Sequence, residues 1–277
     1  MTTKEQANKL KPKPFVKWAG GKKQTLSRLL EFKPAHFNRY IEPFVGGGAL
    51  LFELNFMEGL INDSNEELIN CYEIIRDNPE DLIKDLYKHV NTAEYFYEIR
   101  KQNSSELTKL ERASRLIYLN RTCYNGLWRV NQKNQFNTPF GRYTNPKIVN
   151  AELIPQVSTF LKNVKIYCMD FEKFLLENAK EEDFIYLDPP YHPISKYSDF
   201  KRYTKDFFGL EEQKRLAFIF KKLHEKGCKL LLSNSYSDFI LELYKDFNIV
   251  IIDARRNINK NPDGRGLIKE ILIKNYE

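Results

Sequence analysis

Apolar and polar residues follow two patterns along the chain, and these patterns predict strands and helices in alternation. Short, almost continuous apolar runs predict buried strands, whereas longer stretches with an apolar residue every three or four positions predict helices. A short helix is expected over residues 49–54 and a longer one over residues 210–224. The expected strands cover residues 40–44, 60–63, 164–169, 184–187, 229–233, 249–252 and 271–274. This alternation predicts an α/β fold with a largely parallel sheet, whose last two strands are too close for a helical crossover and pair antiparallel.

The alternation stops between about residue 64 and residue 160. The helices expected there cover residues 66–76, 79–90, 93–101 and 107–120. We interpret residues 64–160 as an inserted, mostly helical subdomain. It interrupts a discontinuous domain formed by residues 14–63 and 161–277. Residues 1–13 carry four lysines and form a basic N-terminal arm.

The second half of the inserted region has an unusual charge pattern. From Arg112 to Ala151 there is no Asp or Glu, although 29% of the chain is charged and its formal net charge is +7. The basic residues there are Arg112, Arg115, Arg121, Arg129, Lys133, Arg142 and Lys147, and the aromatic residues between them are Tyr124, Trp128, Phe136, Phe140 and Tyr143. Basic side chains neutralise phosphates and aromatic rings stack on bases. The pattern therefore favours a nucleic-acid partner over a solvated basic loop with buried aromatic rings.

The composition of the chain indicates which class of protein this is and argues against several kinds of site. Apolar residues make up 42% of the chain, as in an ordinary soluble protein. There is no signal-peptide stretch and no apolar run of membrane-spanning length, so we expect a cytoplasmic protein without a membrane partner. The four cysteines are scattered and form no Cys-x-x-Cys pair, which argues against a disulfide framework and against a zinc site.

The run Asp188-Pro189-Pro190-Tyr191 follows an expected strand, and ligands of open α/β sheets bind at such carboxyl ends. The exocyclic amine of an aromatic base is a poor nucleophile, because its lone pair is delocalised into the ring. Asp188 and the carbonyl of Pro189 are placed to accept its two N–H bonds, and Tyr191 offers a ring face for the base. A rigid turn without a catalytic role is the alternative. The sequence leaves open whether Asp188 takes the proton or only orients the amine.

Two glycine segments predict a cofactor site. Gly46-Gly47-Gly48 follows the first expected strand, and Asp63 ends the next strand, 17 residues after Gly46. Glycines let the backbone turn sharply and approach a ligand, and an acid at that point accepts hydrogen bonds from ribose hydroxyls. In residues 17–22 (KWAGGK), Lys22 is placed to pair with a carboxylate. Turns without a ligand are the alternative for both segments.

Together these segments resemble the DNA adenine methylase (Dam) family of N6-adenine DNA methyltransferases, from about residue 14 to the end of the chain. The matching stretches are residues 15–22 (FVKWAGGK), 42–50 (EPFVGGGAL), 62–63 (ND), 124–131 (YNGLWRVN), 136–143 (FNTPFGRY), 170–171 (DF) and 188–191 (DPPY). The resemblance implies a Rossmann-like S-adenosylmethionine-dependent methyltransferase sheet. It also implies that a helical DNA-recognition subdomain with a hairpin is inserted into that sheet.

The resemblance further implies how the cofactor is held and which reaction follows. The cofactor-binding residues it implies are Trp18, Lys22, Asp63 and Asp188, with Phe44, Asp170 and Phe171 lining the pocket. The methyl group passes directly to N6 of an adenine flipped out of double-stranded DNA, and S-adenosylhomocysteine is the product. The catalytic residues implied are Asp188, Pro189, Pro190 and Tyr191. No covalent enzyme intermediate and no metal are expected, because the cofactor's sulfonium already activates the methyl group.

The family's DNA-reading hairpin corresponds to residues 121–143. Arg129 matches the arginine that reads a guanine edge, since a guanidinium fits the two acceptors there. Lys17 matches a position that contacts the outer guanine. The other DNA contacts implied are Leu127 and Pro139 at the central bases, Tyr124 and Asn125 at the gap left by the flipped adenine, and Asn137 in the same hairpin. These matches support GATC as the target.

Three alternatives remain at this point. Methylation of RNA and methylation of cytosine N4 are disfavoured by the hairpin without acids and, by analogy with the family, by Asp rather than Ser before the two prolines. A DNA-binding protein without catalysis is disfavoured by the pair Asp63 and Asp188, which such a protein does not need. The sequence leaves open a role in restriction-modification, in repair or in a phage. We expect a monomer, because one active site acts on one adenine.

Overall fold

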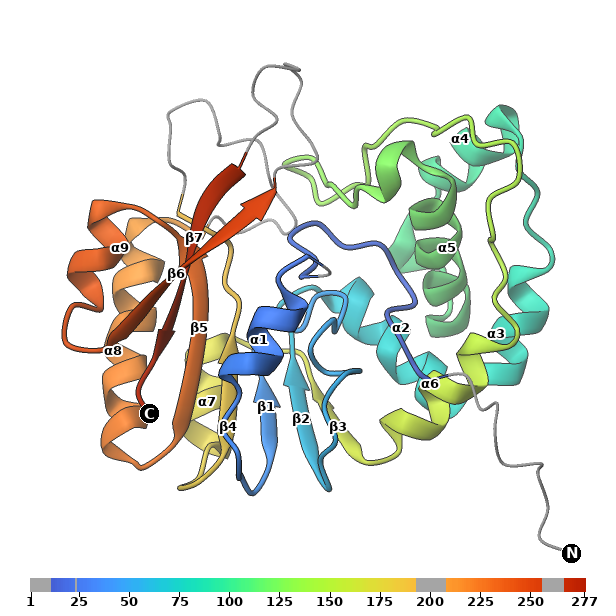
Figure 1. Ribbon diagram of the computed structural model, residues 1–277. Coiled ribbons are helices and arrows are strands. Elements are labelled where there is room, and N and C mark those ends of the chain that lie inside the picture. Colours follow the sequence, from blue (N-terminus) through green and yellow to red (C-terminus); the bar gives the residue numbers. More distant parts are fainter. Residues whose placement is uncertain (1–10, 23, 193–207, 256–266) are drawn as a thin grey trace, which may run out of the picture.

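The computed structural model describes residues 11–22, 24–192, 208–255 and 267–277, and within them seven strands form one sheet (Figure 1). The strand order is β3-β2-β1-β4-β5-β7-β6. The strands are β1 Tyr40–Glu42, β2 Gly59–Asn62, β3 Val164–Tyr167, β4 Phe184–Leu187, β5 Lys229–Ser235, β6 Asn248–Arg255 and β7 Leu267–Lys274. Strands β1 to β5 pair in parallel, whereas β7 runs antiparallel to both of its neighbours, β5 and β6. This is the order of a Rossmann-like sheet with one antiparallel strand inserted before the last, and it confirms the predicted α/β fold.

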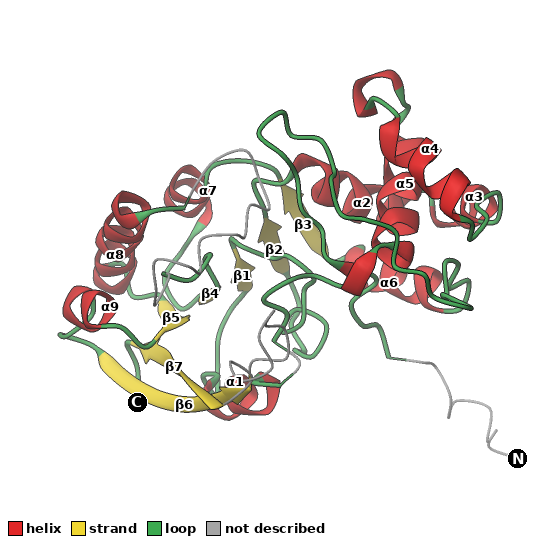
Figure 2. Ribbon diagram, turned by 90° about the horizontal axis from the view of Figure 1, so that it is seen from above, coloured by secondary structure: helices red, strands yellow, loops and turns green. Residues whose placement is uncertain are grey.

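The central strands are buried on both faces, which explains their continuous apolar runs. In β4, Phe184 and Tyr186 belong to the apolar cluster on one face, whereas Ile185 and Leu187 belong to the cluster on the other. Helices α7 Phe171–Asn178, α8 Leu210–Glu225 and α9 Asp238–Leu243 cover the second face, and α1 Leu26–Phe32 lies on the first (Figure 2). A parallel sheet covered on both faces needs no polar face.

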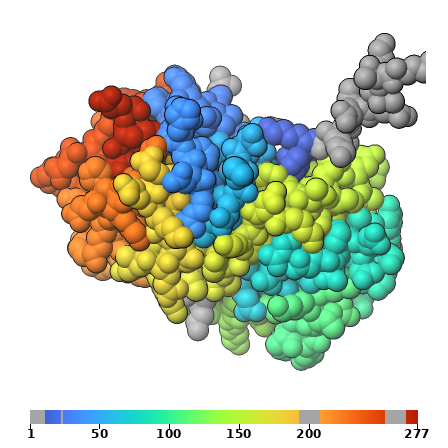
Figure 3. Space-filling view, turned by 90° about the horizontal axis from the view of Figure 1, so that it is seen from below, coloured from blue at the N-terminus to red at the C-terminus, as the bar shows by residue number. Residues whose placement is uncertain are grey.

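Five further helices lie together beside β3, at the edge of the sheet (Figure 1). They are α2 Glu66–Asp77, α3 Pro79–Leu86, α4 Ala93–Lys101, α5 Lys109–Thr122 and α6 Leu153–Leu161, with short 3₁₀ turns at Ser104–Glu106 and Tyr124–Gly126. Helix α5 begins with a capping box between Thr108 and Glu111. One buried apolar cluster continues from the sheet into these helices. The two parts therefore form one continuous body, which Figure 3 shows from below.

The helix predicted over residues 49–54 is wrong. The chain there forms a succession of turns, with isolated hydrogen bonds from Phe52 N–H to the carbonyl of Gly48 and from Leu54 N–H to that of Leu50. Leu50, Leu51 and Phe52 are all buried, because this loop is covered on several sides rather than along one helical face. The predicted antiparallel pairing of the last two strands is confirmed.

The strand order defines where a ligand site is expected. From β1 the chain moves outward to β2 and β3, and it then returns to β4 on the other side of β1. The carboxyl ends of β1 and β4 therefore lie side by side at a topological switch point, where open α/β sheets bind their ligands. Residues 43–48 follow β1 and residues 188–191 follow β4, so both predicted motifs meet at this point.

Candidate active site

Lys22 and Asp188 form a buried ion pair at the switch point. Lys22 Nζ lies 2.7 Å from Asp188 Oδ1, and the two side chains are 8% and 18% exposed. The same ammonium donates to the carbonyl of Gly20 at 3.0 Å and lies 4.5 Å from the centre of the Tyr191 ring. The Tyr191 hydroxyl donates to Glu270 Oε2 at 3.0 Å. The structure thus gathers the lysine of one predicted motif with the aspartate and the tyrosine of another.

Asp188 has a perturbed acidity. Burial raises the pKa of its carboxyl to about 6, and the charge and hydrogen bond of Lys22 oppose this rise. At neutral pH the carboxylate is therefore mostly ionised and can accept hydrogen bonds through both oxygens. A carboxylate in this state, close to an aromatic ring and at the end of a strand, is suited to bind an amine.

The turn after β1 requires glycine at position 46 for two reasons. Gly46 has φ +47°, and a Cβ added there would lie 2.8 Å from Cδ1 of Trp18. Its N–H donates to Asp63 Oδ2 at 3.0 Å, and its carbonyl accepts from the Tyr72 hydroxyl at 3.0 Å. Trp18 and Asp63, both predicted as cofactor residues, therefore shape this turn directly.

Asp63 holds the backbone at two points. Besides Gly46, it accepts from the N–H of Asn65 at 2.9 Å through Oδ1. Burial raises the pKa of Asp63 to about 6, while these two backbone hydrogen bonds lower it. A carboxylate offers about four acceptor positions, so Asp63 can also accept from the hydroxyls of a ligand.

An aromatic cluster lies beside the turn. The rings of Phe44 and Phe171 are 5.3 Å apart, and the Phe208 ring packs on both, at 5.7 and 5.8 Å. Arg215 lies 4.5 Å over the Phe171 ring and pairs with Asp170. Asp170 also caps α7 by accepting from the N–H groups of the next turn. Sequence reasoning named Phe44, Asp170 and Phe171 but missed Phe208, which lies in no recognised motif.

Glu42, the last residue of β1, is a second buried carboxyl that sequence reasoning did not single out. Its Oε2 accepts from the Tyr40 hydroxyl at 2.9 Å. Burial raises its pKa well above the ordinary value, the Tyr40 hydrogen bond lowers it, and the charge of Asp188 adds to the rise. The signal was present in the sequence, because an acid inside a buried apolar strand is uncommon.

The predicted hairpin is present and has a buried side and an outer side. Isolated bridges pair Cys123 with Phe140 and Val130 with Phe136. Trp128, Val130 and Phe136 are buried, and the rings of Trp18 and Trp128 stack with centres 6.3 Å apart. Trp128 and Phe136 therefore belong to the core and are not free to stack on bases. The prediction from the sequence pattern, that these rings stack on bases, is wrong for these two residues.

The residues predicted to read DNA lie on the outer side. Arg129 Nε donates to Asn137 Oδ1 at 2.8 Å, and the two residues also share a backbone hydrogen bond. Tyr124 is 56% exposed, and Asn125 beside it has φ +56°. Leu127 is half-buried and Pro139 is exposed.

Lys17 connects the hairpin to the N-terminal segment. Its backbone N–H and carbonyl form a reciprocal pair with the side-chain amide of Asn120, at 2.8 and 2.7 Å. Its ammonium lies 5.1 Å over the Tyr143 ring. The predicted guanine contact thus comes from a segment that is anchored to α5.

Three of the basic residues in the stretch without acids are structural. Arg112 pairs with Glu67 on α2, and Arg115 and Arg121 donate to backbone carbonyls within the helical region and the N-terminal segment. These three guanidinium groups therefore have structural partners in the fold, which the charge pattern alone did not reveal. The exposed basic residues of the stretch are Lys133, Arg142 and Lys147.

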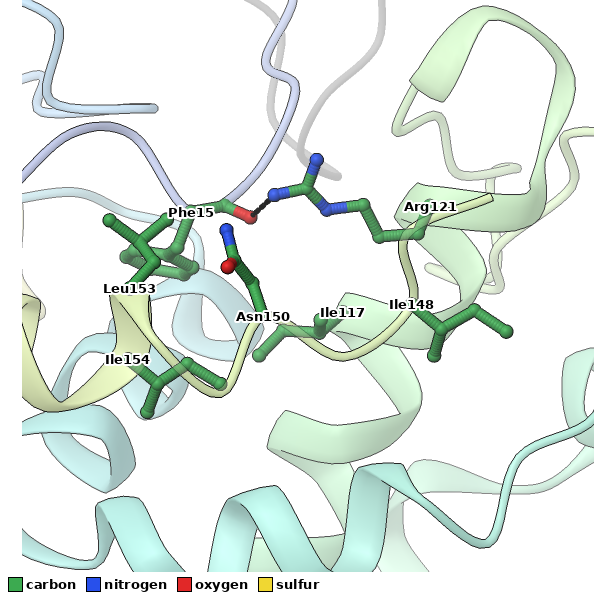
Figure 4. Close-up of a pocket in the computed structure, with 7 residues that line it drawn as sticks. All are labelled: Phe15, Ile117, Arg121, Ile148, Asn150, Leu153 and Ile154. Atoms are coloured by element: carbon green, nitrogen blue, oxygen red, sulfur yellow. Dashed lines mark hydrogen bonds between the residues drawn. The ribbon is translucent and has the colours of Figure 1, made fainter. Parts of the chain in front are cut away.

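A small cavity elsewhere in the protein is not part of this site. It lies between the N-terminal segment, α5 and α6 (Figure 4), where Arg121 donates to the carbonyl of Phe15. Its lining is mostly apolar and includes Ile117, Leu153 and Ile154. Within the described ranges there is no group of His, Cys, Asp or Glu side chains that could hold a metal ion, and no helix long and apolar enough to cross a membrane.

Comparison with known proteins gives consistent matches. The profile of one family, described as D12 class N6 adenine-specific DNA methyltransferase, matches residues 18–258. The type II methyltransferase M1.LlaDCHI of Lactococcus lactis subsp. cremoris is 48% identical over 98% of this chain and 98% of its own. The type II methyltransferase M.MjaIII of Methanocaldococcus jannaschii is 44% identical over 95% of this chain and 99% of its own. The DNA adenine methylase of Haemophilus influenzae is 36% identical over 95% and 94% of the two chains.

Proposed function

The chain belongs to the D12 class of N6 adenine-specific DNA methyltransferases, and we propose that it methylates an adenine flipped out of double-stranded DNA, within GATC. Enzymes of this family use S-adenosylmethionine as the methyl donor. The observation that carries the proposal is the buried pair of Lys22 and Asp188, 2.7 Å apart at the switch point of the sheet. It places an ionised carboxylate beside an aromatic ring and next to a glycine turn.

The side chains around the glycine turn fit the chemical groups of S-adenosylmethionine. Lys22 offers a cation to a carboxylate, and Asp63 offers acceptors to hydroxyls. Phe44 and Phe171 offer ring faces to an adenine, and Phe208 extends that cluster. S-adenosylmethionine, when bound, supplies a methyl group that its sulfonium has already activated, so direct transfer needs no metal and no covalent enzyme intermediate.

Asp188 and its neighbours prepare the target amine. The Asp188 carboxylate and the carbonyl of Pro189 accept the two N–H bonds, which directs the nitrogen lone pair toward the methyl group. The prolines restrict the backbone, and Tyr191 stacks on the extruded base. Because burial raises the pKa of Asp188 to about 6, this carboxylate can also receive the proton that the amine loses.

We assign DNA recognition to residues 64–160, with the hairpin as the reading element. The Arg129 guanidinium, oriented by Asn137, reads a guanine edge, and Lys17 reads the outer guanine. Leu127 and Pro139 contact the central bases. Tyr124 and Asn125 occupy the gap left by the flipped adenine, a role that the exposed ring of Tyr124 supports. We further propose a role in restriction-modification, since two relatives are named type II methyltransferases.

The test is methylation of defined duplexes by the purified protein. Labelled S-adenosylmethionine is incubated with a GATC duplex, with its single-base variants, with the same strand alone and with RNA. Label should enter only the GATC duplex, and an endonuclease that is blocked by GATC methylation should then fail to cut it. Equal labelling of a variant site would contradict GATC specificity, and labelling of RNA would contradict the proposed substrate.

A further inference from the structure

The residues that follow Asp188 are fixed by hydrogen bonds from elements outside the recognised motifs. Gln213, in the first turn of α8, donates from Nε2 to the carbonyl of Pro190 at 2.9 Å. Asn234, near the end of β5, accepts from the N–H of His192 at 3.2 Å, and the Ser235 hydroxyl donates to the carbonyl of His192 at 2.8 Å. Helix α8 and strand β5 therefore hold this segment through its backbone.

Gln213 and Asn234 also hold each other. Asn234 Nδ2 donates to Gln213 Oε1 at 3.0 Å, and Asn234 Oδ1 accepts from the N–H of Ser235 at 2.8 Å. Each side-chain amide thus uses its nitrogen as a donor and its oxygen as an acceptor. If either amide were rotated by 180°, its NH₂ group would point at another N–H donor and these hydrogen bonds would be lost. Gln213 is only 1% exposed and Asn234 is fully buried, so water cannot replace a lost partner.

The two proline carbonyls are used differently. Gln213 occupies the carbonyl of Pro190, whereas no group in the described part of the chain donates to the carbonyl of Pro189. The proline rings fix φ at both residues, so the remaining freedom of the segment is rotation about ψ. An anchor at the Pro190 carbonyl restricts that rotation while leaving the Pro189 carbonyl to the substrate amine.

We propose that Gln213 and Asn234 are positioning residues for methyl transfer. They fix the backbone after Asp188, so that its carboxylate and the Pro189 carbonyl meet the target amine in the reactive geometry. This inference rests on the proposed catalytic role of residues 188–191. A displacement of about 1 Å in such a site costs roughly 100-fold in rate. Neither amide contacts Lys22 or Asp63, so the cost falls chiefly on kcat.

Gln213→Glu tests the inference through its pH dependence. An ionised Glu keeps the acceptor for Asn234 but has no donor for Pro190, whereas a protonated Glu donates to Pro190 and still accepts from Asn234. At pH 8, kcat should fall about 10- to 100-fold, and the KM values for cofactor and DNA should stay near those of the wild type. The ratio of variant to wild-type kcat, measured per folded molecule with circular dichroism at each pH, should rise as the pH falls to 6. A merely structural role would change only the folded fraction.

The control variant is Asn178→Asp. Asn178, the last residue of α7, also donates from its side-chain amide to a carbonyl, that of Phe174 at 2.9 Å, but it belongs neither to the proposed active site nor to the DNA-recognition region. It should keep the kcat of the wild type at every pH. If Gln213→Glu fails to fold, Ser235→Ala is the second variant, because it removes one hydroxyl from an otherwise intact strand. Its kcat should fall severalfold at unchanged KM.

Asp188→Ala, measured in the same assay, separates the two proposals, because it removes both carboxylate oxygens. If Asp188→Ala keeps the wild-type kcat, residues 188–191 are not the catalytic site and the proposed function fails. If Asp188→Ala is inactive but the variants of Gln213 and Ser235 match the wild type, only the positioning role fails. A kcat ratio for Gln213→Glu that does not change with pH, or a loss confined to the KM for the cofactor, would also overturn that role.

Discussion

Replacing Lys22 with methionine should shift the pH range in which the enzyme works. The Lys22 ammonium lies 2.7 Å from the Asp188 carboxylate, and it opposes the burial that raises the pKa of Asp188 to about 6. Without the ammonium, this pKa should rise further, to roughly 7–9, since a close opposite charge shifts a pKa by about 1–3. A protonated Asp188 has lost one acceptor, so the rate should follow the ionised fraction.

The size of the effect follows from this titration. With a pKa of about 6, about nine-tenths of Asp188 is ionised at pH 7, whereas with a pKa of about 8 only about one-tenth is. The single-turnover rate of Lys22→Met at pH 7 should therefore be about a tenth of the wild-type rate. It should recover near pH 9, because the carboxyl is ionised again there.

The assay is rapid-quench methyl transfer from pH 5.5 to pH 9.5, with cofactor and duplex at saturation. Methionine keeps most of the length of the side chain, and it removes the charge together with the contacts of the ammonium to Asp188 and to the carbonyl of Gly20. Lys165→Met is the matched control, because Lys165 lies 2.7 Å from Glu58 at an exposed position, and its loss should leave the profile unchanged. An acid limb of Lys22→Met that coincides with that of the wild type would refute the reasoning.

Three other changes should have distinct effects. Gly46→Ala places a Cβ 2.8 Å from the Trp18 ring at a residue with φ +47°. Calorimetric titration should therefore show cofactor binding weakened by about 1–2 kcal/mol. Unchanged binding would mean that the turn does not contact the cofactor. Arg129→Ala should reduce discrimination at one guanine by about 1–3 kcal/mol, as measured by competition between GATC and its single-base variants, and an unchanged preference would remove Arg129 from the reading residues. Lys133→Ala should weaken binding to all duplexes alike and lower the salt dependence by about one phosphate contact, which a salt titration checks; a sequence-dependent loss would contradict a phosphate role.

Much of the fold could be predicted because buried parallel strands leave a strong signal. The apolar run before Asp188 and the run after residue 59 have no polar face, and both became neighbours of β1 in the sheet. The sequence also predicted that Lys22 pairs with a carboxylate. It did not identify Asp188 as the partner, because the two residues are far apart in sequence and only the strand order brings them together.

Other features depend on tertiary contacts that local pattern does not contain. Gln213 is an ordinary polar residue in the first turn of an amphipathic helix, and its burial results from packing against β5. Arg115 was counted with the phosphate-binding residues, although it donates to a carbonyl of α4. For Trp128 and Val130 a signal was available, because these residues alternate with Leu127 and Arg129 at the spacing of a half-buried strand.

The most direct test of the central claim, that Asp188 directs methylation of adenine N6, is to identify the methylated nucleoside. Unmethylated GATC duplex is incubated with S-adenosylmethionine and either the wild type or Asp188→Ala, digested to nucleosides and analysed by mass spectrometry. Circular dichroism and DNA binding confirm that the variant is folded. The wild type should form N6-methyladenine, and Asp188→Ala should form it roughly a thousandfold more slowly. Formation at the wild-type rate by Asp188→Ala, or a methylated cytosine as the product of the wild type, would contradict the claim.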